Sequence, residues 1–427
     1  MTFLTGWGRT SPSPATVARP STCEDVRKLV VEASARGVVA RGLGRSYGDA
    51  AQNSGGLVLD CTGLSSWSFA DGVVTADAGV SLHELMTALV PRGWFVPVSP
   101  GTRQVTVGGA IAADVHGKNH HRDSSFGAHV RALTLVTADG QARRLGQDDP
   151  LFWATVGGMG LTGVVTSAEF ACVPIGSALM RVDVERTRDL DETLAALSSG
   201  DDRYRYTVAW IDLIGGRGRG VLTRGDHVER GSLEFAPRTR LTAPPWAPNG
   251  LLNRATVEAF NLAWYYKAPR RKTIFQGISP FFHPLDGIDG WNRMYGPRGF
   301  VQYQFVVPFG AEETLRAIVG RLRGMPTFVP VLKRFGAGSR GMLSFPTPGW
   351  TLAFDVPAGQ PGLARLLHTF DEWVAAAGGR LYLAKDSRMP ASLMPLTYPR
   401  LAEWRAIRDD VDPHGLFQSD LGRRLRL

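Results

Sequence analysis

Roughly the first 175 residues alternate between two patterns of apolar positions. From Val26 to Ala33, apolar residues recur at the spacing of one helix face, after Ser21 and Glu24 in capping-box positions. Ser81 and Glu84 precede a second run of this kind. Short apolar runs between these helices have the length and composition of buried strands.

Two Asp-Gly pairs predict β-hairpins in this region. Asp71-Gly72 separates two strand-like runs, and Asp139-Gly140 follows the apolar run 133–137. Asp149 followed by Pro150 is typical of a helix start. Hairpins mixed with helices indicate an α+β fold and not a uniformly doubly wound sheet.

The character of the chain changes between about residues 181 and 380, where aromatic residues become frequent. The pattern predicts strands at Phe300–Val307 and Thr351–Val356, and helices at Glu312–Arg323 and Leu363–Ala377. The Pro-rich segment 237–253 is predicted to be an irregular surface loop. A chain of 427 residues is too long for one ordinary core, so we expect a second α+β domain here.

Composition narrows the class of partner. Lys and Arg exceed Asp and Glu by 48 − 39 = 9. This excess suits nucleic acid, anionic lipid or a phosphorylated substrate, or a basic surface without a specific partner. The basic runs are short, as in Arg270-Arg271-Lys272, so a nucleic-acid partner is not expected.

Location is constrained by what the chain lacks. No apolar run approaches the length of a membrane span, and residues 1–20 do not read as a signal peptide. Cys23, Cys61 and Cys172 are far apart, which argues against a zinc site or a disulfide framework. We therefore expect a cytoplasmic or peripheral membrane protein, with a periplasmic location left open.

Three glycine-dense segments are the strongest candidates for ligand binding. They are Arg41 to Asp49, Pro100 to Ala112, and Thr155 to Val165. The first is not a Rossmann fingerprint, because Tyr47 stands where the third glycine should fall. Each segment alone could be a turn, but three in one domain fit a long ligand with a pyrophosphate and a planar ring.

Two polar strings could carry chemistry. Asp114 to His121 holds three histidines, but no accompanying Cys, Asp or Glu set favours a metal, and none is predicted. The alternative is a polar site strip that includes His116 and Lys118. Leu381 to Arg388 is a strand-like run that ends in charges, which could also be solvated ion pairs.

The glycine segments resemble the FAD-binding domain of the vanillyl-alcohol-oxidase-type family. In that family a histidine in the first loop is often bonded covalently to the flavin. Arg45 stands at the matching position here, and the loop has no histidine. The resemblance therefore implies FAD held non-covalently.

Within that family the chain is most similar to the actinobacterial flavoproteins that oxidise lipid-linked ribose. The similarity runs over nearly the whole chain and is most specific at His116 to His121 and Ala384 to Arg388. It implies a two-domain α+β flavoprotein whose substrate domain has an antiparallel sheet. The implied segments are an FAD-binding part at 1–176, a substrate domain at 177–379 and a return to the FAD domain at 380–427.

The resemblance also implies roles for individual residues. The residues implied to bind FAD are Gly42, Gly44, Arg45, Ser46, Tyr47, Gly101, Thr102, Thr106, Gly108, Gly109, His116, Gly117, Val164 and Tyr382. Those implied to face the substrate are Lys118, Trp210, Tyr295, Gln302, Gln304, Lys333, Phe335, Ala353 and Lys385. Lys385 and His116 are the expected catalytic residues, Lys385 as the essential one.

The implied reaction is FAD-dependent oxidation of the ribose 2′-hydroxyl of decaprenylphosphoryl-β-D-ribose. A separate NADH-dependent reductase would convert the keto sugar to the arabinose donor for cell-wall arabinan. Mycobacterial members carry a cysteine where this chain has Ala353, so we expect resistance to inhibitors that trap that thiol. The alternatives left open are an oxidase of a soluble alditol or aldonolactone, and a flavin-free protein that binds cell wall or nucleic acid.

Overall fold

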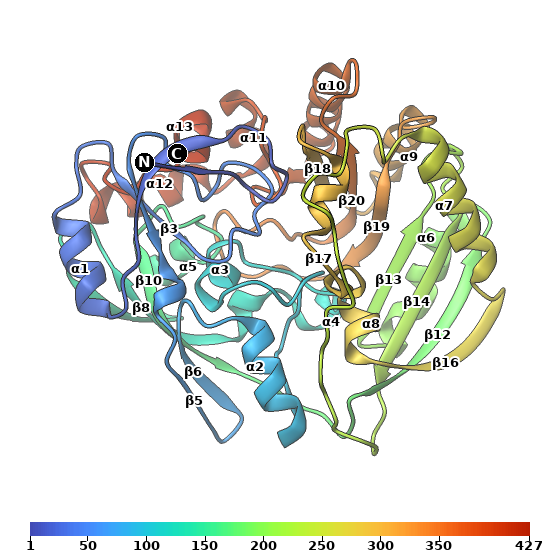
Figure 1. The fold of residues 1–427 in the computed structure, drawn as a ribbon, viewed down its shortest axis with the longest axis horizontal. Helices are drawn as coiled ribbons and strands as arrows, with labels where there is room; N and C mark the ends of the chain where they lie inside the picture. Colours follow the sequence, from blue (N-terminus) through green and yellow to red (C-terminus); the bar gives the residue numbers. More distant parts are fainter.

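A computed structural model describes residues 1–427, which form two lobes side by side (Figure 1). The first lobe holds two main sheets and a two-stranded antiparallel pair, β7 (Trp94–Phe95) with β11 (Val173–Pro174). The smaller main sheet has the order β1-β2-β4-β3, made of β1 (Thr2–Leu4), β2 (Ser13–Ala18), β4 (Leu57–Asp60) and β3 (Val38–Arg41). The larger is antiparallel, with the order β5 (Trp67–Ala70), β6 (Val73–Asp77), β10 (Val164–Ala171), β8 (Val130–Val136) and β9 (Ala142–Gly146). Both hairpins expected from Asp-Gly pairs are present, as β5–β6 and β8–β9.

Helices of the first lobe begin at the expected turns, with one shift. The N-cap of the first helix is Thr22, which pairs with Asp25, so the capping box lies one residue beyond the predicted Ser21 and Glu24. Ser81 caps the second helix as predicted, although the Glu84 carboxylate accepts a hydrogen bond from the Trp67 indole. The helices of this lobe are α1 (Cys23–Val31), α2 (Leu82–Leu89), α3 (Val107–Ala112), α4 (His120–Asp123), α5 (Pro150–Thr155), α11 (Met394–Thr397), α12 (Leu401–Val411) and α13 (Asp420–Leu425).

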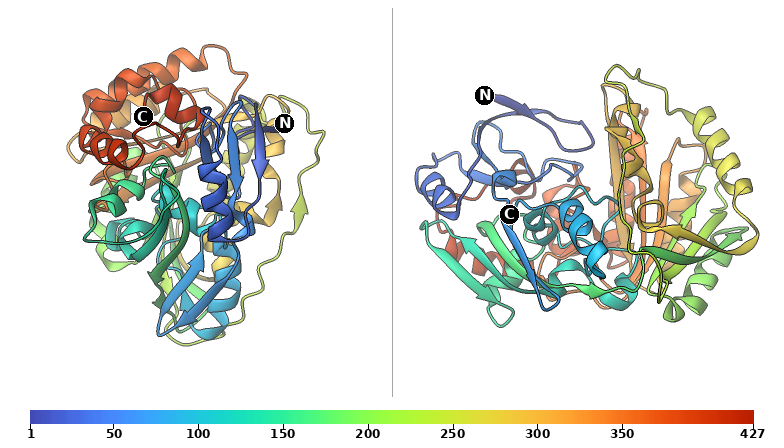
Figure 2. Two further views of the ribbon diagram at one scale, coloured as in Figure 1. Left: turned by 90° about the vertical axis from the view of Figure 1, so that its left-hand side faces the viewer. Right: turned by 60° about the horizontal axis from the view of Figure 1, so that its bottom comes forward.

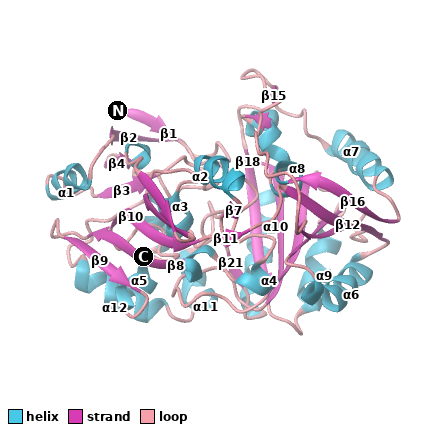
Figure 3. Ribbon diagram, turned by 90° about the horizontal axis from the view of Figure 1, so that it is seen from below, coloured by secondary structure: helices cyan, strands magenta, loops and turns pink.

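The second lobe is built on one eight-stranded antiparallel sheet. Helices α6 (Leu190–Gly200), α8 (Ile278–Phe282), α9 (Glu312–Arg321) and α10 (Leu363–Ala376) pack against it, while α7 (Arg254–Lys267) lies at its periphery (Figure 3). The strands, in sheet order, are β16 (Arg271–Gly277), β12 (Leu179–Thr187), β14 (Gly220–His227), β13 (Tyr206–Ile211), β19 (Phe328–Phe335), β20 (Gly349–Pro357), β18 (Phe300–Val307) and β21 (Arg380–Leu381).

The segment 237–253 is more regular than its composition suggested. It contains β15 (Leu241–Thr242), which pairs in parallel with β17 (Ile288–Asp289). The expectation of a wholly irregular loop is therefore wrong at these two residues. The rest of the segment runs along the outside of the molecule (Figure 2).

The carboxyl-terminal segment returns to the first lobe after β21, whose pairing with β18 keeps the chain in the large sheet through Leu381. Helix α12 contacts α5, and Phe417 bridges to Val38. One cluster of 84 buried apolar residues spans both lobes, so they share a continuous core. No helix in the molecule combines the length and apolar character needed to cross a bilayer.

Candidate active site

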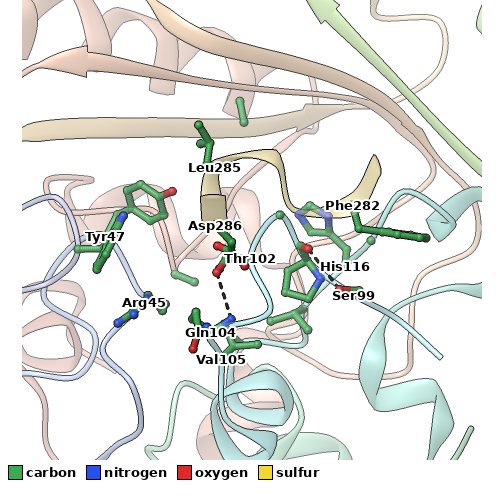
Figure 4. A pocket seen from close by; sticks show the side chains of 18 of the residues that line it. Arg45, Tyr47, Ser99, Thr102, Gln104, Val105, His116, Phe282, Leu285 and Asp286 are labelled. Carbon is green, nitrogen blue, oxygen red and sulfur yellow. Dashed lines mark hydrogen bonds between the residues drawn. The ribbon is translucent and has the colours of Figure 1, made fainter. Parts of the chain in front are cut away.

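A cavity of about 910 Å³ lies where the two lobes meet, and both contribute to its walls. This volume is at the upper end of the range for ligand pockets. Arg45 and Tyr47 project from the first glycine loop, while His116 and Phe282 lie across the cavity from them (Figure 4). Leu285 and Asp286 approach from the second lobe.

All three glycine segments reach this cavity, and their backbones lie close to it. A Cβ at Gly101 would meet no atom within 4 Å, because that residue borders open space. A Cβ at Gly42 would collide with the hydroxyl of Thr106. That hydroxyl accepts a hydrogen bond from Gly109 N at 3.1 Å and caps α3. Exposed backbone and small residues along one wall fit the pyrophosphate and ring system of FAD.

His116 is held by residues of the opposite lobe. Its Nδ1 lies 3.0 Å from Nζ of Lys333, and its Nε2 lies 3.0 Å from Nε2 of Gln304. The ring packs edge-on against Phe335, with centroids 4.8 Å apart. Burial, with the charge of Lys333 as the next cause, holds the pKa of His116 well below its ordinary value. The imidazole is therefore neutral and positioned from both sides.

Lys385 lies four residues beyond the end of β21, in a loop that is hydrogen-bonded to the first glycine segment. Tyr47 N donates a hydrogen bond to the carbonyl of Ala384 at 2.9 Å. Nζ of Lys385 then lies over the Tyr47 ring, 3.7 Å from its centroid. Burial lowers the pKa of Lys385 to about 7, against the opposing effect of the Asp355 carboxylate. An amine of this kind can give up or accept a proton near neutral pH.

Two further lysines border the same cavity. Lys118 donates to the carbonyl of Phe281 and lies 4.5 Å from that ring's centroid. Burial lowers the pKa of Lys118 to about 7. Burial, aided by repulsion from Lys118 and Lys385, lowers the pKa of Lys333 to about 7 as well. An anion bound among these three amines would stabilise their charged forms.

Asp355 places a carboxyl group among these lysines, and no sequence motif marks it. It lies on β20, lines the cavity and is buried. Gln302 Nε2 donates to its Oδ1 at 2.6 Å, and the Tyr295 hydroxyl donates to its Oδ2 at 3.0 Å. Burial raises the pKa of Asp355 to about 7, so its carboxyl can exchange a proton near neutrality.

The structure brings most of the expected site residues to the cavity. The expected residues that line it are Gly42, Gly44, Arg45, Ser46, Tyr47, Gly101, Thr102, Thr106, Gly108, Gly109, His116, Gly117, Lys118, Trp210, Gln302, Gln304, Lys333, Ala353, Tyr382 and Lys385. The remaining three expected residues lie behind the wall. Val164 faces the core beside Val38, and Phe335 packs between His116 and His120. The Tyr295 ring stacks on Phe300, and its hydroxyl donates to Asp355.

Side chains alternate between the two faces of a strand, which explains why Val164 faces the core while its neighbours Gly163 and Val165 line the cavity.

The three histidines of the polar strip have separate surroundings. His120 packs on Phe335, and His121 Nε2 lies 3.0 Å from the carbonyl of Tyr204. Only His116 of the three lines the cavity.

Several cavity residues escaped sequence reasoning because no motif marks them. Ser99 and Asp286 line the wall, and Ser99 Oγ lies 2.6 Å from His283 Nε2. Asp286 accepts a hydrogen bond from Arg103 N at 2.8 Å. Trp7, at the start of the chain, stacks under the Arg45 guanidinium at 4.3 Å. Each is an isolated residue in its segment, and only the fold brings it to the site.

Comparison with known proteins agrees with this geometry. Residues 14–146 match the family model described as an FAD binding domain. The chain is 46% identical to a decaprenylphosphoryl-β-D-ribose oxidase of Mycolicibacterium smegmatis, over 99% of this chain and 97% of the relative.

More distant similarity extends to enzymes of soluble sugars. The chain is 26% identical to an alditol oxidase of a Streptomyces species, with 99% of both chains covered. It is 24% identical to an L-gulono-1,4-lactone dehydrogenase of Mycobacterium tuberculosis, over 97% of this chain and 96% of the relative. These names describe oxidoreductases of an alditol and of a lactone. The chain is an FAD-dependent oxidoreductase and belongs to the decaprenylphosphoryl-β-D-ribose oxidase family.

Proposed function

We propose that this enzyme oxidises the 2′-hydroxyl of decaprenylphosphoryl-β-D-ribose to the 2′-keto sugar. The observation that carries the proposal is the set of three half-buried lysines, Lys118, Lys333 and Lys385, around a single cavity. A neutral sugar alcohol would leave these amines without an anionic partner. A substrate with a phosphodiester would supply one.

Lys118 and Lys333 are the proposed partners of the phosphate. Neither has a carboxylate within ion-pairing distance in the protein. Their lowered pKa values mean that they gain protons when an anion enters. Binding of the phosphate is therefore coupled to protonation of Lys118 and Lys333.

An apolar wall continues from the lysines and suits a prenyl chain. It is formed by side chains from the inner face of the eight-stranded sheet. They are Val184, Val208, Trp210, Val221, Ile274 and Val331. A soluble alditol or lactone would leave this wall in contact with water, which disfavours the second candidate function that the distant relatives suggest.

FAD, held along the glycine segments, would supply the hydride acceptor when bound. Lys385 accepts or orients the proton of the reacting hydroxyl, and its neutral form is accessible near pH 7. Asp355, held by hydrogen bonds from Gln302 and Tyr295, is a second group of the site that can exchange a proton near neutral pH. His116, held between Lys333 and Gln304, supports the sugar as a neutral hydrogen-bonding group.

The keto product requires a second enzyme. We propose that an NADH-dependent reductase reduces it to the arabinose epimer, the donor for cell-wall arabinan. A polyprenyl-linked substrate resides in a bilayer, so we also propose that this enzyme contacts a membrane peripherally.

The experiment is anaerobic mixing of the purified yellow protein with two kinds of substrate. A short-chain polyprenylphosphoryl ribose should bleach the flavin absorbance, and ribitol or a pentonolactone should not. Bleaching by the soluble alditol alone would overturn the proposal and favour the second candidate.

A further inference from the structure

Helix α7 presents an apolar face to solvent. Its contacts with the sheet run through Val257, Asn261 and Tyr265, one residue per turn. Asn261 Nδ2 donates to Asp212 Oδ1 at 2.9 Å, and the Tyr265 hydroxyl donates to the carbonyl of Thr187 at 3.2 Å. These contacts fix which side of the helix faces the protein.

The opposite side of α7 is unusually free of charge. Its exposed residues are Ala255, Thr256, Ala259, Leu262, Ala263 and Tyr266. Phe260 and Trp264 are also exposed and flank this side, where Phe260 contacts Phe328 with ring centroids 5.3 Å apart. Arg254 and Glu258 lie toward the contact side by helix spacing. Tyr266 is 63% exposed and Leu262 is 49% exposed. A surface helix normally carries polar residues on its outer face, whereas an exposed apolar face is typical of a helix that contacts a membrane or another protein.

A basic cluster follows the apolar face directly. Lys267, Arg270, Arg271 and Lys272 are all exposed, and none has a carboxylate within 4 Å. The segment 237–272 holds seven Lys and Arg residues and one acidic residue, Glu258. Unpaired cations beside exposed aromatics are the composition of a helix that lies in the interface of an anionic bilayer.

The same helix borders the substrate cavity. Trp264 and Lys267 line its wall, as do Ala268 and Pro269 just beyond the helix. The apolar wall described above is therefore continuous with the outer face of α7. Figure 1 shows α7 on the outside of the second lobe, away from the termini.

We propose that the outer face of α7, with the basic cluster 267–272, docks on an anionic lipid bilayer and so places the cavity beside the membrane. This rests on the proposed function, since a lipid-linked substrate must pass from the bilayer to the lysines without exposing its prenyl chain. The aromatic rings occupy the interfacial region, and the cations contact lipid phosphates.

The test is flotation of the full-length, FAD-loaded protein with phosphatidylcholine vesicles that either contain or lack phosphatidylglycerol. The apolar variant is Leu262→Ser/Tyr266→Ser, and the charge variant is Arg270→Gln/Arg271→Gln/Lys272→Gln. None of these residues lines the cavity. Matched controls on the first lobe are Phe3→Ser/Leu396→Ser and Arg19→Gln/Lys28→Gln/Arg131→Gln, all at exposed positions.

Wild-type protein and both controls should float with the anionic vesicles and not with the neutral ones. Each α7 variant should lose vesicle binding by about tenfold or more. Turnover of a soluble short-chain substrate should stay unchanged in these variants, while turnover of the long-chain substrate in vesicles falls.

Equal flotation of wild-type and α7 variants would overturn the docking surface, as would equal binding to neutral vesicles. If the variants differed from wild type in sedimentation but not in flotation, the outer face of α7 would be a self-association surface, and the proposal of membrane docking would be overturned. If no phosphoryl ribose reduces the flavin, the proposed function fails, but flotation still reports on the surface independently.

Discussion

Lys333 Nζ lies 3.0 Å from His116 Nδ1, so an amine on the large sheet of the second lobe contacts an imidazole of the first lobe. His116 follows α3, which the second glycine segment forms, and Lys333 lies on β19. The two lobes therefore complete one polar site only when they are seated together. The shared core that spans them keeps this geometry fixed.

Lys385→Ala is expected to slow flavin reduction by about 10²- to 10⁴-fold, the usual contribution of a positioned acid or base. FAD absorbance should change little, because Lys385 is not part of the glycine segments that form the FAD wall. Rapid-mixing absorbance measurements give the rate. Lys28→Ala, at an exposed position on α1, is the control, and a near wild-type rate in Lys385→Ala would remove the lysine from the mechanism.

Substrate affinity is expected to fall as pH rises. Lys118 and Lys333 have pKa values lowered to about 7 in the free enzyme, and a bound phosphodiester favours their charged forms. Below pH 7 both are already protonated, whereas above it each proton taken up on binding raises KM by about tenfold per pH unit. The measurement is KM from pH 6 to 9, and a Lys118→Met variant should show a shallower rise. A KM independent of pH would contradict the assignment.

Arg424→Met is expected to destabilise the protein by about 3 kcal/mol and to weaken FAD retention. Arg424 binds Asp49 of the first glycine segment with two bonds of 2.8 and 2.9 Å, and Asp386 beside Lys385 at 2.8 Å. Its loss leaves two largely buried carboxylates without their partner. Urea unfolding and the temperature of FAD release measure the effect.

The matched control for that variant is Arg188→Met, which removes an exposed i,i+4 pair with Glu192. It should leave the urea unfolding transition nearly unchanged. Equal effects of the two substitutions would show that Arg424 does not tie the loops together.

Ala353→Cys is expected to make the enzyme sensitive to inhibitors that trap a thiol in the cavity. Ala353 lines the wall on β20, opposite Gln304 on β18. The wild type should resist them, although Cys61 also borders the cavity, because burial raises the pKa of that thiol to about 12 and keeps it unreactive. Intact-protein mass after incubation shows the adduct, and labelling of the wild type at Cys61 would refute this reasoning.

The elements with strong local patterns could be predicted from sequence. Phe300–Val307 is a strand with the expected bounds, and Ser81 caps its helix, since alternation and capping are local properties. The first capping box shifted by one residue because Thr22 and Asp25 offer the same chemistry as their neighbours. The short strand at Leu241–Thr242 depends on a partner at Ile288, which no local pattern reveals.

The site residues also include some that a sequence motif marks and others that only the fold brings together. Glycine segments and the strings around His116 and Lys385 marked the cavity, because several unusual residues stand together there. Asp355 could not be found, since its importance arises from burial beside Tyr295 and Gln302. Tyr295 was expected at the substrate, but its hydroxyl is occupied by Asp355 behind the wall.

The most direct test of the central claim is the isotope dependence of flavin reduction under anaerobic conditions. A short-chain polyprenylphosphoryl ribose with deuterium at C2 should bleach the flavin several-fold more slowly than the unlabelled compound, while deuterium at C3 should have no such effect. That result would show that the hydride leaves C2 of a phosphoryl ribose. Equal rates for the C2 and C3 isotopologues, or a slow step only with C3 deuterium, would contradict the account.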